Sequence, residues 1–122
     1  MTVPPTNDLR ETVHEGFVIL HVIGYCEAEL GARLVERIES LARAGNTRIV
    51  IDLATCSIIN SPGVASLLDA ALRLVEDFRG RLVLCGLDRL KTSVLSMAKV
   101  LPMVPATADV PTAVALLQEH QR

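Results

Sequence analysis

The chain has 122 residues and a net charge of −2, and 50% of its residues are hydrophobic while only 2% are aromatic, which predicts a single domain with an aliphatic core. Its lysines and arginines are scattered, and no set of aromatic side chains is available to stack on bases, so the composition argues against a nucleic-acid-binding surface. The N-terminal residues lack the basic start and apolar run of a signal peptide, and no uninterrupted apolar stretch could span a membrane, so we expect a cytoplasmic protein.

Three cysteines, at positions 26, 56 and 85, are too few and too widely spaced to suggest a disulfide framework or a zinc site. We expect them to be small hydrophobic groups. Cys85 should lie on a buried strand, whereas Cys26 and Cys56 should be more accessible because loops flank them. No cofactor or metal is expected.

The first predicted elements form a β-hairpin. Residues 17–23 (Phe-Val-Ile-Leu-His-Val-Ile) are an apolar, β-branched run, and the weaker segment 9–14 can pair with it around Glu15-Gly16. We assign residues 1–8 to a flexible tail and residues 9–119 to the folded domain.

An amphipathic helix is predicted after Glu27. Apolar residues recur every three or four positions from Leu30 to Leu41, charged residues take the other side, and Gly45-Asn46 supplies a stop. Residues 48–53 (Arg-Ile-Val-Ile-Asp-Leu) are almost continuously apolar, as in a strand covered on both faces. This strand should therefore be central in a parallel sheet.

The rest of the chain continues to alternate helices and strands. A second helix should begin at Ser61-Pro62, with the serine as N-cap and the proline at the first helical position, and end at Gly80. The later elements are a strand at 81–85, a helix from Asp88, a short strand at 103–106 and a last helix that Pro111 opens and that carries Val114 and Leu117. The predicted buried stripe of the helix from Asp88 consists of Leu90, Val94, Ala98 and Leu101.

This order of elements predicts a single-domain α/β fold with a mixed, mostly parallel sheet of about five strands and about four helices. The parallel neighbours should be joined by right-handed crossovers. The expected core includes Ile51, Leu67 and Val83.

No catalytic constellation is evident, so we expect the chain not to be an enzyme. The three histidines lie away from any catalytic motif, and His21, within an apolar strand, is best explained as a hydrogen-bonded core or sheet-face side chain. The glycines form no phosphate-binding loop. Asp52, which ends the central strand, either borders a binding loop or caps a turn.

The clearest functional signal is the segment 58–65 (Ile-Ile-Asn-Ser-Pro-Gly-Val-Ala), which puts Ser61 between a strand and a helix. A phosphate there would add about −1.5 to −2 charges near the positive end of the helix dipole. The stretch 49–68 resembles the STAS signature, in which a hydrophobic strand ending in Asp-Leu leads through a short loop to Asp-Ser-Ser/Thr-Gly and a helix. The order of elements from about Leu9 to Leu117 also resembles STAS domains, in particular those of bacterial anti-sigma-factor antagonists.

This resemblance implies a regulatory module that works by partner switching. In such antagonists the serine matching Ser61 is phosphorylated by a partner serine kinase that is also the anti-sigma factor. The unmodified form binds this partner and frees the sigma factor, and the phosphorylated form releases it. This chain departs from the family in having Asn60 where aspartate is usual and Pro62 where serine or threonine is usual, which removes a charge, an N–H and a hydroxyl.

An earlier segment, 24–27 (Gly-Tyr-Cys-Glu), aligns with a family turn that commonly reads Gly-x-Leu-Asp and lies close to the phosphorylation site. The resemblance gives Glu27 the acidic role, while Tyr25 is either a core or an interface residue. The expected partner-binding residues are Gly24, Tyr25, Glu27, Asn60, Ser61, Pro62, Gly63 and Ser66.

Two other functions remain open from the sequence. The first is a STAS-like subunit with permanent partners, either in a stressosome-type scaffold with other STAS proteins or in a lipid-transport complex, in which Ser61 is never phosphorylated. The second is a small enzyme or ligand-binding protein with a pocket at the strand ends, for which the sequence offers no catalytic constellation.

Overall fold

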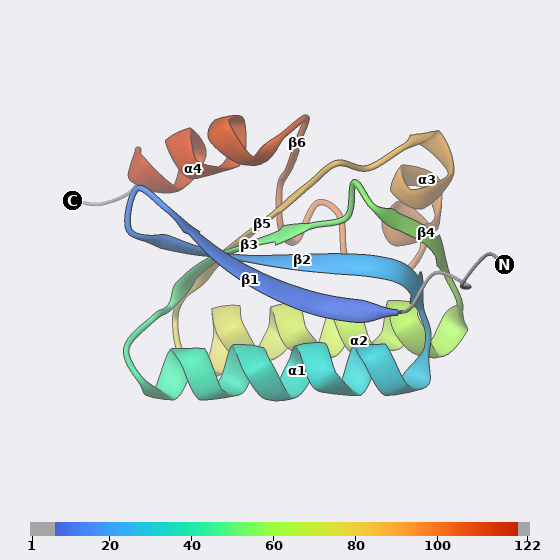
Figure 1. Cartoon of the computed structure of the whole chain (residues 1–122), viewed down its shortest axis with the longest axis horizontal. Helices are drawn as coiled ribbons and strands as arrows, with labels where there is room; N and C mark the ends of the chain where they lie inside the picture. Colours follow the sequence, from blue (N-terminus) through green and yellow to red (C-terminus); the bar gives the residue numbers. More distant parts are fainter. Residues whose placement is uncertain (1–6, 120–122) are drawn as a thin grey trace, which may run out of the picture.

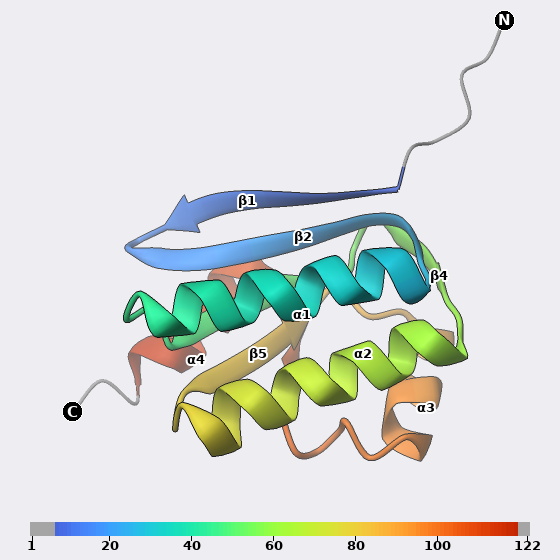
Figure 2. The same cartoon turned by 90° about the horizontal axis from the view of Figure 1, so that it is seen from below.

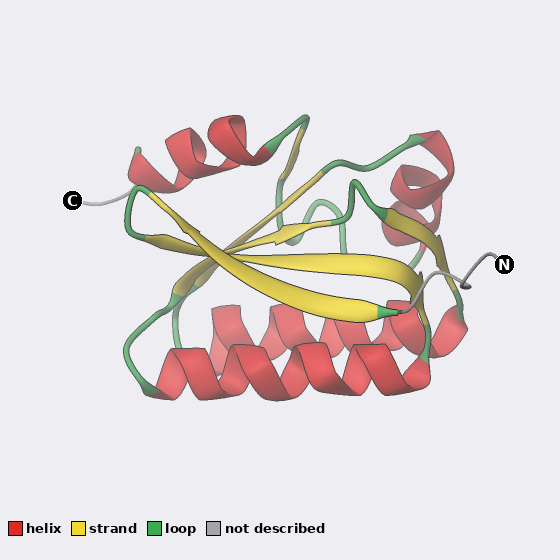
Figure 3. Cartoon of the chain, in the orientation of Figure 1, coloured by secondary structure: helices red, strands yellow, loops and turns green. Residues whose placement is uncertain are grey.

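The computed structural model describes residues 7–119, which form a sheet with helices on both faces (Figures 1 and 3). The strands are β1 (Asp8–His14), β2 (Phe17–Cys26), β3 (Arg48–Asp52), β4 (Cys56–Ile59), β5 (Arg81–Cys85) and β6 (Ala106–Thr107). Their order is β1-β2-β3-β5-β6, with β4 pairing with β2 off this path. Only β1 and β2 are antiparallel, so the predicted α/β fold with a mostly parallel sheet is confirmed.

Helices cover the two faces of the sheet unequally (Figure 2). α1 (Ala28–Arg43) and α2 (Ser61–Leu72) lie side by side on one face, and α2 continues into the π-helical turn η1 (Arg73–Asp77). α4 (Val110–Gln118) packs over β3 and β5 on the other face. α3 (Arg89–Met97) lies at the end of the sheet, near β4 (Figure 1).

The sheet divides the core into two layers of side chains. The larger layer lies against α1 and α2 and includes Ile51 and Leu67, and the smaller lies against α4 and includes Val83. All three side chains are buried, which confirms their prediction as core residues. Because burying a large aliphatic side chain stabilises the fold by about 1.5–3 kcal/mol, a core almost without aromatic residues is sufficient for a domain of this size.

The predicted hairpin opens the fold. Residues 8–14 pair with residues 17–23, and the turn residues Glu15 and Gly16 have φ angles of 51° and 86°, as in the two-residue turns that match the twist of paired strands. β1 thus begins one residue before the expected start of the domain. Residues 1–6 of the expected tail lie outside the described residues.

β4 is a strand that the sequence analysis missed. It pairs with the last residues of β2, which extends beyond its predicted end as far as Cys26. This pairing buries both Cys26 and Cys56, so the expectation that these two thiols are accessible is wrong, whereas Cys85 is buried as predicted. β4 is only four residues long and its two middle residues are exposed, so it shows neither an apolar run nor a clear alternation.

α3 is rotated about its axis relative to the prediction. Leu90 is predicted to be in the buried stripe, but its side chain is 72% exposed, and Lys91 and Leu95 are the buried residues of this helix. The other members of the predicted stripe are only partly buried: Val94, Ala98 and Leu101. Because α3 lies at the end of the sheet and not over its face, only Lys91 and Leu95, one turn apart, are buried within the helix, while Ala98 and Leu101 after it pack against the edge of the core.

The C-terminal elements are close to their predicted positions. The strand expected at 103–106 is instead a two-residue strand at 106–107, because the backbone turns at residues 101–103 before it reaches β5. Val114 and Leu117 on α4 are buried as predicted.

Candidate partner-binding site

The candidate site lies where β2 and β4 end and α1 and α2 begin. Here the segments 24–27 and 60–66 meet, because the backbone N–H of Asn60 donates to the carbonyl oxygen of Cys26 (3.1 Å). Gly63 packs so closely on the same carbonyl that a Cβ atom would come within 2.2 Å of the oxygen, which explains why a glycine stands at this position. The two segments that the STAS resemblance implies to be adjacent are therefore adjacent.

Asn60, and not Ser61, is the N-cap of α2. Its Oδ1 atom accepts a hydrogen bond from the backbone N–H of Gly63 (2.9 Å), and its backbone is extended. Ser61 and Pro62 are the first two residues of the helix, so the predicted serine cap is wrong by one position. Asparagine caps helices about as well as aspartate, so the departure from the family pattern keeps the cap while it removes a charge.

The Ser61 side chain is exposed on the first turn of α2. The neighbouring backbone groups cannot readily bind a phosphate on it: Pro62 has no N–H, and Gly63 and Val64 donate theirs to the side chain and the carbonyl of Asn60. A phosphate at Ser61 would lie near the positive end of the helix dipole but would receive no hydrogen bond from these three residues. Its charge would therefore be hydrated by solvent, or would interact directly with a bound partner.

Glu27, which the resemblance puts in the acidic position, is the N-cap of α1. Its carboxylate accepts hydrogen bonds from the backbone N–H groups of Glu29 (3.0 Å) and Leu30 (2.8 Å). These bonds favour the charged form and hold the pKa of the Glu27 carboxyl below its usual value. An ionised carboxylate is therefore present beside the site at neutral pH.

The other predicted site residues differ in how open they are. Tyr25 is 41% exposed, which excludes the core alternative and leaves the interface one. Gly24 has a φ of +85°, a conformation that suits glycine, and lies next to Asn7. Ser66 is half-buried against Gly31 of α1, where a Cβ atom would come within 2.4 Å of its hydroxyl oxygen. Ser66 therefore sets the close spacing of α1 and α2 more than it offers an open surface.

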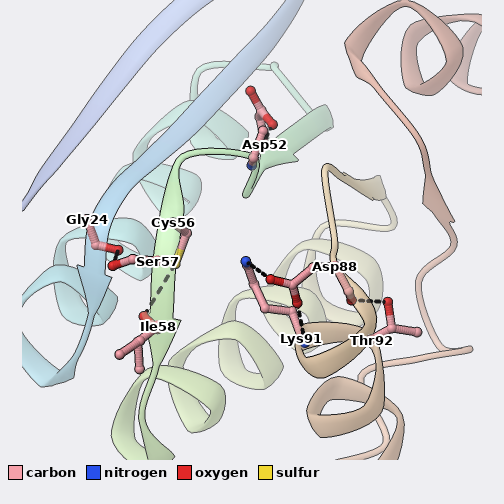
Figure 4. A network of polar contacts seen from close by, with 9 residues as sticks. Gly24, Asp52, Cys56, Ser57, Ile58, Asp88, Lys91 and Thr92 are labelled. Carbon is pink, nitrogen blue, oxygen red and sulfur yellow. Dashed lines mark hydrogen bonds and ion pairs between the residues drawn. The ribbon is translucent and has the colours of Figure 1, made fainter.

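β4 is fastened to β2 by a side chain as well as by backbone bonds (Figure 4). The Ser57 hydroxyl donates to the carbonyl oxygen of Gly24 (3.1 Å), and the Gly24 N–H donates to the carbonyl oxygen of Thr55 (3.0 Å). These bonds fix the start of β4, and the bond from the Asn60 N–H to the Cys26 carbonyl fixes the other end, where α2 begins.

A hollow of about 570 Å³ lies beside Ser61, between the start of α2 and α3. Its walls are mainly apolar and consist of Ile59, Asn60, Ser61, Val64, Val94, Met97 and Ala98. Met97 in this wall is 80% exposed, and Ile58, which is 56% exposed, extends the apolar surface outside the hollow. This surface could not be expected from the sequence, because it involves β4, which was not predicted, and the outer face of α3, whose orientation differs from the prediction.

An ion pair fixes the first turn of α3 next to this hollow (Figure 4). Asp88 accepts hydrogen bonds from both the backbone N–H (2.8 Å) and the Nζ atom (2.9 Å) of Lys91. The Lys91 ammonium holds the pKa of the Asp88 carboxyl below its usual value. No sequence pattern pointed to this pair, since a lone lysine is usually an exposed residue.

His21 and Asp52 make a separate network on the face of the sheet that carries α4. His21 Nδ1 lies 2.8 Å from Asp52 Oδ2, and His21 Nε2 lies 2.7 Å from the Thr12 hydroxyl, which confirms a hydrogen-bonded histidine on the sheet face. Asp52 Oδ1 accepts the N–H of Ala54 (3.0 Å), as expected of a turn cap. Within residues 7–119, no group of three or more metal-binding side chains is assembled, and no helix is both long and apolar enough to cross a membrane.

Comparison with known proteins identifies the family. A model of the STAS domain matches residues 9–113. The chain belongs to the STAS domain family. No curated protein sequence gives a significant match to this STAS domain.

Solved structures of anti-sigma factor antagonists share the fold of this STAS domain. An antagonist from Mycobacterium paratuberculosis is 15% identical with a TM-score of 0.79, over 97% of this chain and 99% of that chain. Unphosphorylated SpoIIAA is 20% identical with a TM-score of 0.65, over 96% and 100% of the two chains. Phosphorylated SpoIIAA from Bacillus is 18% identical with a TM-score of 0.68, over 91% and 99%. At these identities the similarity establishes the fold, and the predicted STAS architecture is confirmed.

Proposed function

We propose that this STAS domain is an anti-sigma factor antagonist that acts by partner switching in the cytoplasm. The unmodified chain binds an anti-sigma factor with serine-kinase activity and thereby frees a sigma factor. The same partner phosphorylates Ser61, and the complex then separates. The partner supplies the catalysis, and the chain itself requires no cofactor.

The observation that carries this proposal is an exposed Ser61 hydroxyl in the wall of an apolar hollow. A kinase can reach the hydroxyl, and partner side chains that fill the hollow would lie next to it. A phosphate at Ser61 would bring about −1.5 to −2 charges to this surface. Because Pro62, Gly63 and Val64 offer it no free N–H, burying that charge under a partner would cost desolvation energy that hydrogen bonds from these three residues do not offset.

The proposed partner surface is formed by the segments 24–27 and 60–63. Tyr25, an exposed aromatic side chain, is suited to act as an anchor in a partner pocket. Glu27 contributes a fixed negative charge, and Ser66 contributes by holding α1 and α2 at close range. SpoIIAA, which has a similar fold, is known in unphosphorylated and phosphorylated forms. This similarity supports the proposal that the fold of this chain accommodates a phosphate.

A second candidate is a STAS subunit with permanent partners, such as other STAS proteins. Two observations favour it: the cap of α2 is an uncharged Asn60, and Pro62 removes an N–H and a hydroxyl next to Ser61. In this case the same surface would be covered in all conditions and Ser61 would stay unmodified.

Affinity capture separates the two candidates. The full chain, used as bait in native cytosol, should recover an ATP-binding anti-sigma factor, and its intact mass should include one phosphate that is absent from the Ser61→Ala variant. Recovery of sister STAS proteins or of a membrane transport complex, with the chain unmodified, would contradict partner switching and support the permanent subunit.

A further inference from the structure

One row of apolar side chains runs along the outer face of α3. Leu90, Val94 and Met97 are spaced by four and three residues, so they form one row on the helix, which we call the α3 stripe. Leu90 and Met97 are the most exposed large hydrophobic residues of the described chain. Val94 and Met97 line the hollow that contains Ser61, and Leu90 lines a smaller adjoining cavity with Ile58. A continuous apolar surface of this kind indicates an interaction site.

Positive charges stand at both ends of the α3 stripe. Arg89 is the first residue of α3 and Lys99 follows its last turn, and both side chains are exposed. Neither forms an ion pair with another residue in the range 7–119, whereas the carboxylate of Asp88 is already paired with Lys91. With a rise of 1.5 Å per residue, the two cations are separated by roughly 15 Å along the helix direction.

We propose that the α3 stripe and the hollow beside Ser61 receive an amphipathic helix of the partner protein, apolar on one face and acidic at both ends. This inference rests on the proposed function, because it specifies the partner that Ser61 controls. A helix with apolar residues at i, i+3, i+4 and i+7 fits an elongated apolar groove, and acidic residues about ten positions apart would meet Arg89 and Lys99. Phosphate at Ser61, in the wall of the same hollow, would repel that acidic helix.

Two other occupants fit this surface less well. In a two-fold dimer, antiparallel α3 helices would bring Arg89 of one copy beside Lys99 of the other, so like charges would oppose the contact. A lipid surface would meet the exposed side chains but would leave the concave hollow unfilled. A helix from another protein satisfies both the shape and the charge.

Two synthetic helical peptides test the proposal against the full chain. They share one leucine face, and one carries glutamates at both ends while the other carries lysines. In an NMR titration of backbone amides, the glutamate peptide should shift residues 56–64 and 88–99 and bind about tenfold more tightly than the lysine peptide. Replacing both apolar residues (Leu90→Ser with Met97→Ser) should weaken its binding by about tenfold or more.

Matched variants control for unrelated effects. Val13→Ser removes a side chain that is 67% exposed on β1, away from the groove, and should leave peptide binding unchanged. Replacing both cations (Arg89→Gln with Lys99→Gln) should bring the affinities of the two peptides close together. All variants change exposed residues, so their melting temperatures should match that of the parent.

Several results would overturn the proposal. The first is equal binding of the two peptides, and the second is no binding of either peptide to the parent. The third is that the parent forms a dimer, or binds anionic vesicles, and that Leu90→Ser with Met97→Ser abolishes this association. The switch is tested separately with Ser61→Asp. If this variant binds the glutamate peptide as the parent does while the other results hold, the groove stands and the proposed control by Ser61 fails.

Discussion

Single side chains at the starts of helices position the candidate site. Glu27, Asn60 and Asp88 accept backbone N–H groups in the first turns of α1, α2 and α3. The sequence indicates where each helix begins, but it assigns the cap of α2 to Ser61 because serine is as good a cap as asparagine and proline often follows a cap directly. Two adjacent capping residues cannot be told apart by type, and only the path of the backbone decides between them.

The capping assignment predicts different costs at two neighbouring positions. Asn60→Ala should lower the free energy of unfolding by about 0.5–2 kcal/mol, because the N–H of Gly63 loses its acceptor. Ser61→Ala should leave it almost unchanged, and Asn60→Asp should retain the cap. Urea denaturation followed by circular dichroism measures all three. A loss of stability for Ser61→Ala as large as that for Asn60→Ala would mean that Ser61 is the N-cap.

The cysteines should be unreactive in the native chain. Burial raises the pKa of the Cys26 and Cys85 thiols to about 12, and it also raises that of Cys56, so the reactive thiolate is scarce at neutral pH. A thiol reagent should therefore label the native chain no faster than the chain unfolds locally or globally, and it should label the chain rapidly in denaturant. Rapid labelling of Cys26 or Cys56 without denaturant would mean that β4 does not cover them.

At the scale of elements, periodicity predicts best those segments that have one clear environment. β3 and β5 are apolar throughout because both faces of the sheet are covered, and α1 has one apolar stripe because it lies on one face. β4 and α3 lie at the end of the sheet, where the spacing of apolar residues does not indicate which side of an element is buried. The apolar spacing on α3 exists, but much of it is on the outer face, while Leu95 and Lys91 occupy the inner face.

Equivalent substitutions on α2 and α3 test these orientations. Leu67→Ala should lower the free energy of unfolding by about 2–5 kcal/mol, because this side chain is buried between the helices and the sheet. Leu90→Ala should change it by no more than about 0.5 kcal/mol, because Leu90 is on the surface. The same urea experiment compares them. Equal losses would mean that α3 packs as its periodicity predicts and that the α3 stripe is not exposed.

At the scale of the whole molecule, the site lies at one end of the sheet, where the parallel strands β2 and β4 lead into helices. Binding sites of α/β folds commonly occupy such strand ends. The position of Ser61 could be predicted because the strand, loop and helix of the STAS signature are contiguous in sequence. The hollow could not, because it requires residues 59–64 and 94–98 to pack together across separate elements.

The central claim is that a charge at Ser61 controls partner binding. The most direct measurement is a titration of the parent, Ser61→Ala and Ser61→Asp against the captured anti-sigma factor. Ser61→Ala should bind like the unmodified parent and should not be released when ATP is added. Ser61→Asp should remain folded, since an acidic residue in the first turn suits the helix dipole, but should bind about tenfold or more weakly. ATP should release the parent. If Ser61→Asp binds as tightly as the parent and ATP does not release the parent, partner switching through Ser61 is contradicted.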